Sequence, residues 1–487
     1  MRVLFSWFVL LFNIAVILVS CSAKTDDNTS GSSDNSSTED ISISSSPSGS
    51  STNNANVTFG QTFQYQVTTT GAYSGTLAFS LSNHPEGMTI SSSGLIEWTP
   101  TESEQIKTYS NITITITTAS GYVFTQTFGL TVNASSATII STGVYHSCAV
   151  LDNGSAKCWG HNAYGQLGID NKFDMGDDSG EMAQLTGINL GTGRTATAIS
   201  AGGTHTCALL ENASVKCWGN NGYGKLGIDN STAMGDDSGE MGDNLPSINL
   251  GTDRTAIAIS AGFNHNCALL DNASVKCWGA NNKGQLGIDN TTTMGDGAGE
   301  MGDNLPSINL GTGRTAIAIS AGNNHTCALL DNGAVKCWGF NYTGQLGIDN
   351  DTQMGDGSGE MSQLTGINLG TGRTATAISA GGSHTCAFLD NASVKCWGNN
   401  DNGKLGIDNT TDMGDGSGEM AQLTGINLGT DRTATTISAG MYHNCAKLDN
   451  GAVKCWGRNN LGQLGIDNTT YMGDDSGEMA SLPSINL

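Results

Sequence analysis

The sequence predicts an all-β protein in which a β-propeller of about six blades follows a small N-terminal β-sandwich. Glycine is abundant (67 residues) and proline is scarce (6), which favours short strands and turns over long helices. Residues 57–133 alternate apolar and polar side chains at a period of two, which is typical of half-buried strands. From residue 138 a unit of 59 or 60 residues recurs six times, and this periodicity indicates a propeller, solenoid or array.

Residues 1–20 contain one Arg followed by an apolar run, which is typical of a secretory signal peptide. The run ends in Leu18-Val19-Ser20-Cys21, which resembles the bacterial lipoprotein signal box. The resemblance implies cleavage before Cys21 and acylation of its thiol. A lipid would then hold the mature chain in the bacterial cell envelope, at the outer membrane or cell surface. An ordinary signal peptide with an incidental cysteine, or a retained membrane helix, are the alternatives.

Residues 21–56 contain the lipidated cysteine followed by Ser, Asn and Asp with almost no apolar side chains. Such a segment buries too little surface to fold, so we expect a disordered tether. Residues 57–133 then form the predicted sandwich. Their stretch "GTLAFSLSNHPEGMTISSSGLIEWTPT" resembles the immunoglobulin-like, cadherin-like domains of exported bacterial proteins, with Pro85, Gly94 and Trp98 at the pattern positions. In that family the domain usually acts as a spacer or in adhesion.

Each repeat unit within residues 138–487 contains four strand-like segments, for example "TAIAIS", "HTCALL", "AVKCWG" and "LPSINL". Four strands in each unit suit a propeller blade. The first unit begins with a lone "ATIIS", and the last ends in "SINL". We therefore expect the first and last strands to pair and close the ring.

The repeat letters H-x-C-A-x-L-D-N-G-x-V-K-C-W-G-x-N-x-x-G-Q-L-G, found at 325–347, resemble the regulator-of-chromosome-condensation repeat family. The resemblance covers residues 138–487 and implies a β-propeller, commonly of seven blades, whereas this sequence has six units. The family name also suggests guanine-nucleotide exchange and chromatin binding. Export argues against both, and the net charge of −24 argues against a nucleic-acid partner.

Twelve of the thirteen cysteines form six equally spaced pairs in a chain that would be exported to oxidising surroundings. A turn at Asp331-Asn332-Gly333 would place Cys327 opposite Cys337, within disulfide range. Each bridge closes a loop of about 11 residues, worth roughly 2.5–3 kcal/mol. Buried free thiols and zinc are the alternatives, although zinc lacks a fourth ligand. The predicted disulfides are Cys148–Cys158, Cys207–Cys217, Cys267–Cys277, Cys327–Cys337, Cys386–Cys396 and Cys445–Cys455.

The same register places His325 opposite Gly339, and we interpret this histidine as a packed, hydrogen-bonded scaffold residue. The units differ most in the loops that follow "AG" and "WG", and strand order places both loops at one end of the blades, which we call the upper face. Exposed aromatic side chains on rigid loops are common anchors of recognition, although drift at solvent-exposed positions would also vary these letters. The candidate partner-binding residues are Tyr145, Tyr164, Tyr223, Phe263, Phe340, Tyr342, Tyr442 and Arg458.

An acidic loop in each unit, such as "IDNTTTMGDGAGEMGDN", also lies at this end, and the six copies hold 26 of the 44 acidic residues. Asp349, Asp351 and Glu360 match three EF-hand positions, but Met354 stands where that loop needs Gly and no helices flank it. Carboxylates of solvated turns are the favoured interpretation. A different Ca²⁺ site stays open, and no other cofactor or metal is predicted. The Met residues that flank each loop are expected to pack it onto the blade.

These observations favour a cell-surface lipoprotein that presents a disulfide-stapled propeller to a protein or glycan, in adhesion, recognition or inhibition. We expect no enzyme, because nearly every polar residue recurs in each unit whereas catalysis needs an asymmetric set of groups. A calcium- or metal-dependent propeller enzyme is the alternative. We further expect a monomer that contacts the membrane only through its N-terminal lipid.

Overall fold

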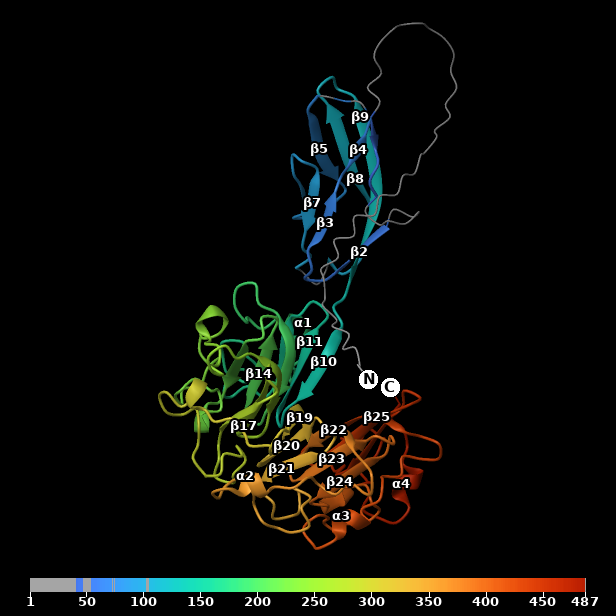
Figure 1. Cartoon of the computed structure of the whole chain (residues 1–487). Coiled ribbons are helices and arrows are strands. Elements are labelled where there is room, and N and C mark those ends of the chain that lie inside the picture. The colour runs from blue at the N-terminus through green and yellow to red at the C-terminus, as the bar shows by residue number, and fades with distance from the viewer. Residues whose placement is uncertain (1–40, 47–53, 72, 74, 102–104, 487) are drawn as a thin grey trace, which may run out of the picture. The chain divides into compact units, whose positions relative to one another are not determined.

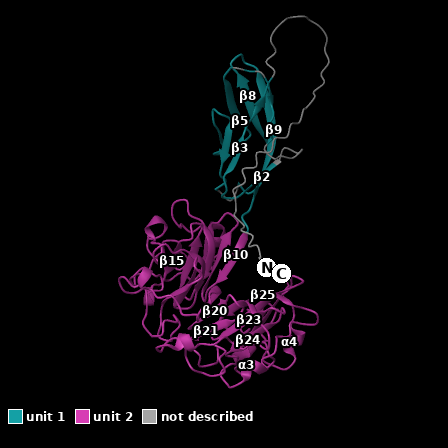
Figure 2. Ribbon diagram, in the orientation of Figure 1, with its two compact units in different colours: residues 1–136 teal, residues 137–487 magenta. Residues whose placement is uncertain are grey.

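The computed structural model describes residues 41–46, 54–71, 73, 75–101 and 105–486. The chain divides into two compact units, residues 1–136 and 137–487 (Figure 2). The predicted signal peptide and Cys21 lie outside the described residues. Among those that are described, no helix is long and apolar enough to cross a membrane.

The N-terminal unit contains a four-stranded sheet in the order β2-β9-β8-β5, a three-stranded sheet in the order β3-β7-β6, and the pair β1-β4. Alternation along β8 buries Ile112, Ile114 and Ile116, and these side chains share a core with Trp98 and Phe128. The strands are β1 (Ser42–Ile43), β2 (Asn54–Thr58), β3 (Phe63–Gln66), β4 (Thr69–Thr70), β5 (Leu77–Ser82), β6 (Thr89–Ile90), β7 (Leu95–Trp98), β8 (Thr108–Thr118) and β9 (Val123–Asn133).

This sandwich begins earlier than the sequence predicts, because β1 and the first three residues of β2 fall within the predicted tether of residues 21–56. Ile41 and Ala55 are buried, and Ile43 packs against the core. The Tyr65 hydroxyl donates a hydrogen bond to Ser45 Oγ at 2.6 Å. A few apolar side chains in a Ser-rich segment are enough to add a strand to an existing sheet, although average composition suggests a tether.

The C-terminal unit consists of six three-stranded antiparallel blades (Figure 1). Their strands follow each other in sequence order, so each blade is a meander. The strands are β10 (Ala137–Thr142), β11 (His146–Leu151) and β12 (Ala156–Gly160); β13 (Ala196–Ala201), β14 (His205–Leu210) and β15 (Val215–Gly219); β16 (Ala256–Ala261), β17 (His265–Leu270) and β18 (Val275–Gly279); β19 (Ala316–Ala321), β20 (His325–Leu330) and β21 (Val335–Gly339); β22 (Ala375–Ala380), β23 (His384–Leu389) and β24 (Val394–Gly398); β25 (Ala434–Ala439), β26 (His443–Leu448) and β27 (Val453–Gly457).

The fourth segment of each unit is not a strand, contrary to the sequence prediction. In "LPSINL" at 305–310 only the Ile308 N–H bonds to the neighbouring strand, at the Val275 carbonyl. Pro306 has no N–H to donate, which weakens pairing here, but the "LTGINL" segments at 185–190, 364–369 and 423–428 contain no proline and form no strand either. Short helical turns precede several of these segments or lie in the upper loops, at α1 (Glu181–Gln184), α2 (Glu360–Gln363), α3 (Glu419–Gln422), α4 (Glu478–Ser481), η2 (Gly222–Gly224), η3 (Gly242–Asn244), η4 (Gly302–Asn304) and η5 (Asp401–Gly403).

The predicted register of the central hairpin is confirmed. His325 pairs with Gly339, Cys327 with Cys337, and Leu329 with Val335. The hairpin turn needs a left-handed residue, which is Gly333 here (φ 76°). All six predicted cysteine pairs form disulfides, with Cα–Cα distances of 4.0–4.1 Å.

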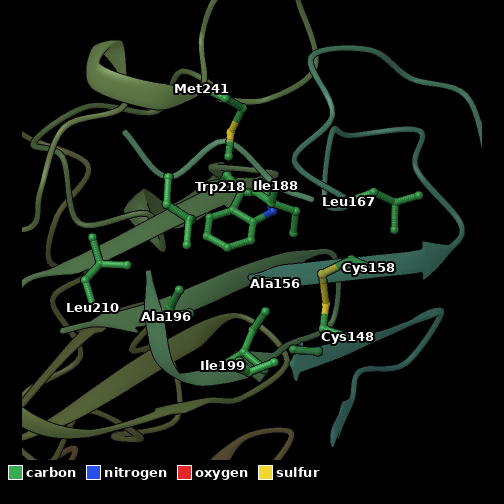
Figure 3. Close-up of a cluster of buried hydrophobic side chains, with 14 of the residues drawn as sticks. Cys148, Ala156, Cys158, Leu167, Ile188, Ala196, Ile199, Leu210, Trp218 and Met241 are labelled. Atoms are coloured by element: carbon green, nitrogen blue, oxygen red, sulfur yellow. A yellow bond between two sulfur atoms is a disulfide. The ribbon is translucent and has the colours of Figure 1, made fainter. Parts of the chain in front are cut away.

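The hydrophobic cores lie between blades, and five of them join the six consecutive blades. In the first, the disulfide Cys148–Cys158 and Leu167 of the first unit face Leu210 and Trp218 of the second (Figure 3). One face of each blade therefore carries the disulfide, which packs against the face of the next blade that carries the buried tryptophan. Burial of these side chains from both partners makes each blade depend on its neighbour.

The predicted closure of the ring by its first and last strands is wrong. The strand β10 pairs with β11, and no core cluster of the described residues joins the sixth blade to the first. Ile140 in the first blade is 67% exposed, whereas its counterpart Ile199 is 6% exposed. At the other end an exposed lysine, Lys447, stands where the fourth blade has the buried Leu329. The blades follow one another from β10 to β25 (Figure 1), and none of the five inter-blade cores of the described residues joins the two ends.

Because the first and last of the described blades share no core, equivalent isoleucines should differ in their contribution to stability. Ile199→Ala should lower the free energy of unfolding by about 2–5 kcal/mol, because it removes buried methylene groups. Ile140→Ala should cost less than about 0.5 kcal/mol, as at other exposed positions. Urea denaturation measures both. Equal losses at the two positions would mean that the ends meet in solution.

Candidate binding face

A repeated set of hydrogen bonds joins consecutive blades beneath the upper face. The Thr385 hydroxyl donates to the Gln345 carbonyl at 2.9 Å, and Trp397 Nε1 donates to the same carbonyl at 3.1 Å. His325 Nε2 lies 2.9 Å from the Thr385 oxygen. A hydroxyl has one proton to donate, so it must accept from His325, which therefore carries its proton on Nε2.

The same arrangement recurs at the other interfaces, with an asparagine in place of the threonine at two of them. His205 Nε2 donates to Asn266 Oδ1 at 2.8 Å, and Asn266 Nδ2 donates to the Lys225 carbonyl at 2.6 Å. Burial lowers the pKa of His265 to about 4 and that of His325 to about 3. These imidazoles are therefore neutral at pH 7, and the interpretation of the histidine as a scaffold residue is confirmed.

In the loops after "WG", the side chain at the position of Gln345 decides the form of the turn, and this residue differs between blades. Gln345 Oε1 accepts the Thr343 N–H at 3.1 Å and closes the turn. The second and fifth blades have Lys225 and Lys404 at this position, and lysine has no acceptor to offer. There the turn becomes a short 3₁₀ segment whose middle residue is left-handed, Tyr223 (φ 67°) and Asn402 (φ 64°) respectively.

The structure exposes most of the predicted partner-binding residues. Five are exposed, namely Tyr145, Tyr164, Tyr223, Tyr342 and Tyr442. The other three, Phe263, Phe340 and Arg458, are half-buried.

These side chains gather into separate groups along the propeller. In the first blade the His161 ring lies between Tyr145 and Tyr164, with centroid distances of 6.0 and 6.4 Å. In the fourth blade Phe340 stacks on Tyr342 at 6.3 Å, and in the sixth Arg458 lies 5.0 Å from the centre of the Tyr442 ring.

Two further residues, which the sequence places among the variable positions after "WG", take part in these groups. Lys283 Nζ lies 5.3 Å above the Phe340 ring, although the two residues belong to different units. His161 is inserted between two tyrosines of its own blade. Neither was predicted as a binding residue, because no spacing rule relates one upper loop to the next.

A cavity of about 400 Å³ opens on the upper face among the loops of the fourth, fifth and sixth blades. Its lining includes three predicted binding residues, Phe340, Tyr442 and Arg458, and also Asn323, Asn399 and Lys404, which were not predicted as binding residues. Lys404 could have been found as a departure from the repeat, because four of the six units have Gln at this position.

The acidic loops use their carboxylates to fold. Glu360 Oε2 accepts the N–H groups of Gly355 and Gly357, both at 2.8 Å. Asp289 of the preceding unit accepts the Met361 N–H at 2.8 Å, and Met361 is buried in the inter-blade core. Within the part of the chain that the structure describes, no three His, Cys, Asp or Glu side chains are grouped to hold a metal ion.

The lower end of the blades is uniform by comparison. Arg254 pairs with Asp271 at 3.2 Å, and the equivalent pair, Arg314 with Asp331, lies at 3.3 Å. Three more copies of this ion pair join the other "GTGR"-type turns to the hairpin turns. The variable side chains therefore lie at the opposite end from these repeated contacts.

Family models match both units of the chain. The model described as "Regulator of chromosome condensation (RCC1) repeat" matches residues 137–166, 196–225, 256–285, 316–345, 375–404 and 434–463, and a second model of that description matches 274–329. The C-terminal unit is an RCC1-repeat propeller. The model described as "Putative Ig domain" matches residues 40–133 and includes the strand β1 that the sequence analysis left in the tether.

Relatives of the RCC1-repeat propeller occur in proteins of different length. The ultraviolet-B receptor UVR8 of Arabidopsis thaliana is 25% identical over 67% of this chain and 78% of its own length. Protein pim1 of Schizosaccharomyces pombe is 26% identical over 65% of this chain and 58% of its own. The human E3 ubiquitin-protein ligase HERC2 is 27% identical over 56% of this chain, which spans only 5% of that ligase.

Solved structures share the fold. Yeast RCC1 (Prp20), solved bound to Kap60, aligns over 72% of this chain and 74% of its own, with a TM-score of 0.56 and 19% identity. Human WBSCR16 aligns over 72% of this chain and 82% of its own, with a TM-score of 0.57 and 16% identity. At these identities the likeness establishes the fold alone.

The buried histidines predict that the RCC1-repeat propeller loses stability in mild acid. Their pKa is about 6.5 in the unfolded chain and about 3–4 for His265 and His325 in the folded one. Below pH 6.5 the unfolded state therefore binds more protons, and stability that is complete above pH 6.5 is lost as the pH falls towards 4. Each such histidine contributes about 1.4 kcal/mol per pH unit.

Urea denaturation at pH 7.0 and pH 5.5 measures this loss, in a range above the ordinary pKa values of the carboxyl groups. His325→Gln should reduce the pH dependence of the free energy of unfolding by the contribution of one histidine, about 1.4 kcal/mol per pH unit. An unfolding midpoint that does not change between the two pH values would contradict the neutral, buried state of these side chains.

Proposed function

We propose that this protein is a non-catalytic binding protein that presents the upper face of its propeller to a protein or glycan, in adhesion, recognition or inhibition. The observation that carries the proposal is the position of the exposed Tyr145, Tyr164, Tyr342 and Tyr442 on loops fixed by the inter-blade hydrogen bonds. Aromatic side chains on a rigid scaffold lose little conformational entropy when they bind.

The difference between the two ends of the blades supports this assignment. The lower end repeats one Arg–carboxylate pair in five places. The upper loops of the same units carry different side chains, including Tyr145 in the first unit, Phe263 in the third and Tyr442 in the sixth. A surface that recognises a partner without sixfold symmetry needs different side chains in different blades, whereas the repeated contacts of the scaffold need the same side chains in each.

We also propose that a lipid on Cys21 anchors the chain to the bacterial outer membrane or cell surface. The lipoprotein-like box at 18–21 supports this, as does the immunoglobulin-like domain, which would act as a spacer before the propeller. Cys21→Ala should release the protein from the membrane fraction of expressing cells. Retention of this variant in the membrane fraction would contradict lipid anchoring.

Binding through the upper face predicts a loss of affinity when its exposed aromatic side chains are truncated. Tyr342→Ala and Tyr442→Ala should each weaken binding at least about thirtyfold, because truncating an interface hot spot costs about 2 kcal/mol or more. Protein and glycan arrays probed with the full chain would identify the partner, and titration calorimetry would then measure its affinity.

Ile317→Ala is the matched control, because Ile317 is an apolar side chain on β19, away from the upper loops, and its exposure lies between those of the two tyrosines. Its affinity should equal that of the unchanged protein. Equal affinity in the two tyrosine variants as well would show that the upper face is not the binding surface.

A further inference from the structure

We propose that the cavity between the loops of the fourth, fifth and sixth blades binds a carboxylated sugar residue, such as a uronic or sialic acid. This proposal rests on the proposed function and names the ligand chemistry for one part of the same face. The cavity has a volume of about 400 Å³, towards the small end of the range of about 300–1,000 Å³ found for small-molecule sites. It has room for one or two sugar rings.

The buried Lys404 requires a hydrogen-bond acceptor from the ligand. Lys404 is 3% exposed, and Asn399 Oδ1 is the partner of its ammonium group. Burial lowers its pKa. An ammonium group has three protons to donate, so Lys404 can still donate to an acceptor that enters the cavity.

The second blade contains a natural comparison. There Lys225 Nζ bonds to Thr204 Oγ1 at 3.2 Å and to Asn264 Oδ1 at 2.9 Å, the latter from the next blade. At the position of Asn264 the sixth blade has Tyr442, which contributes no such amide. The fifth blade therefore keeps the buried cation without the inter-blade amide oxygen, and the cavity opens beside it.

A second cation lines the same cavity. The Arg458 guanidinium lies over the Tyr442 ring, and its Nε donates to Asn460 Oδ1 at 2.7 Å. Lys404 and Arg458 therefore place two cations at this cavity in a chain with a net charge of −24. The carboxylates near them are Asp401 in the lining and Asp412, and both interact electrostatically with Lys404. A ligand carboxylate would gain charge-assisted hydrogen bonds from both cations.

The lining also includes an amide side chain, that of Asn323. Its Oδ1 accepts no hydrogen bond from any described residue and is closed to solvent, so a ligand hydroxyl would reach it only after the side chain turns. The half-buried Phe340 and the ring of Tyr442 provide apolar walls against which a sugar ring can pack.

This combination favours a sugar over an acidic peptide side chain. Besides the two cations, the lining includes Ser383, Asn399 and Asn402, whose groups both donate and accept hydrogen bonds. Several hydroxyls on one ring, next to its carboxylate, can satisfy such a set. An acidic peptide would bring one carboxylate and its backbone N–H groups, with fewer groups that both donate and accept.

Titration calorimetry with the full chain tests the proposal, using D-glucuronic acid and N-acetylneuraminic acid against glucose and N-acetylglucosamine. The carboxylated sugars should bind at least tenfold more tightly than the neutral ones. Lys404→Gln should weaken their binding at least tenfold, and it should fold normally because four blades have Gln at this position. Lys225→Gln, the matched change in the second blade, should leave the affinity unchanged.

Three results would overturn the proposal: no binding of either carboxylated sugar, equal binding of the neutral sugars, or unchanged affinity in Lys404→Gln. Binding of a short poly-glutamate peptide in preference to the sugars would assign the cavity to an acidic protein segment instead. If the sugars fail but Tyr342→Ala still weakens capture of a partner, this inference falls and the proposed function stands.

Discussion

One backbone carbonyl at each blade interface organises the C-terminal unit. The carbonyl of Gln345, for example, accepts from Trp397 and Thr385 of the next blade, and Thr385 in turn accepts from His325. These hydrogen bonds connect three buried places: His325 at the start of the hairpin, Gln345 in the loop after "WG", and the next blade. The loops of the upper face are therefore fixed by the same bonds that hold the blades together, and burial keeps the imidazole neutral.

That dependence also explains the two ends of the propeller. Each interior blade packs one face against the disulfide of the preceding blade, and its own disulfide packs against the following blade. The first and last blades each lack one of these two neighbours. Ile140 is therefore exposed, although the equivalent Ile199 is buried. Five interfaces of one geometry fix the turn between blades. The sequence marks the open end only by Lys447, which stands where the fourth blade has the buried Leu329.

Much of the repeat unit could be predicted because it depends on local rules. A hairpin centred on Asn332 fixes the pairing of Cys327 with Cys337, since side chains alternate along strands and the turn sets the register. The cavity at Lys404 could not be predicted, because it depends on Tyr442 replacing an asparagine in a neighbouring blade. The strand β1 was missed because two isoleucines are hidden in a Ser-rich segment.

The inter-blade hydrogen bonds are tested most directly by the protonation state of the histidines. Long-range ¹H–¹⁵N spectra of the full chain labelled with ¹⁵N-histidine would report both ring nitrogens, with His→Gln variants used for assignment. We predict that His265, His325 and His384 are neutral and carry their proton on Nε2 at pH 7, and that they stay so at pH 5.5. A proton on Nδ1, or a doubly protonated ring at pH 5.5, would contradict this prediction.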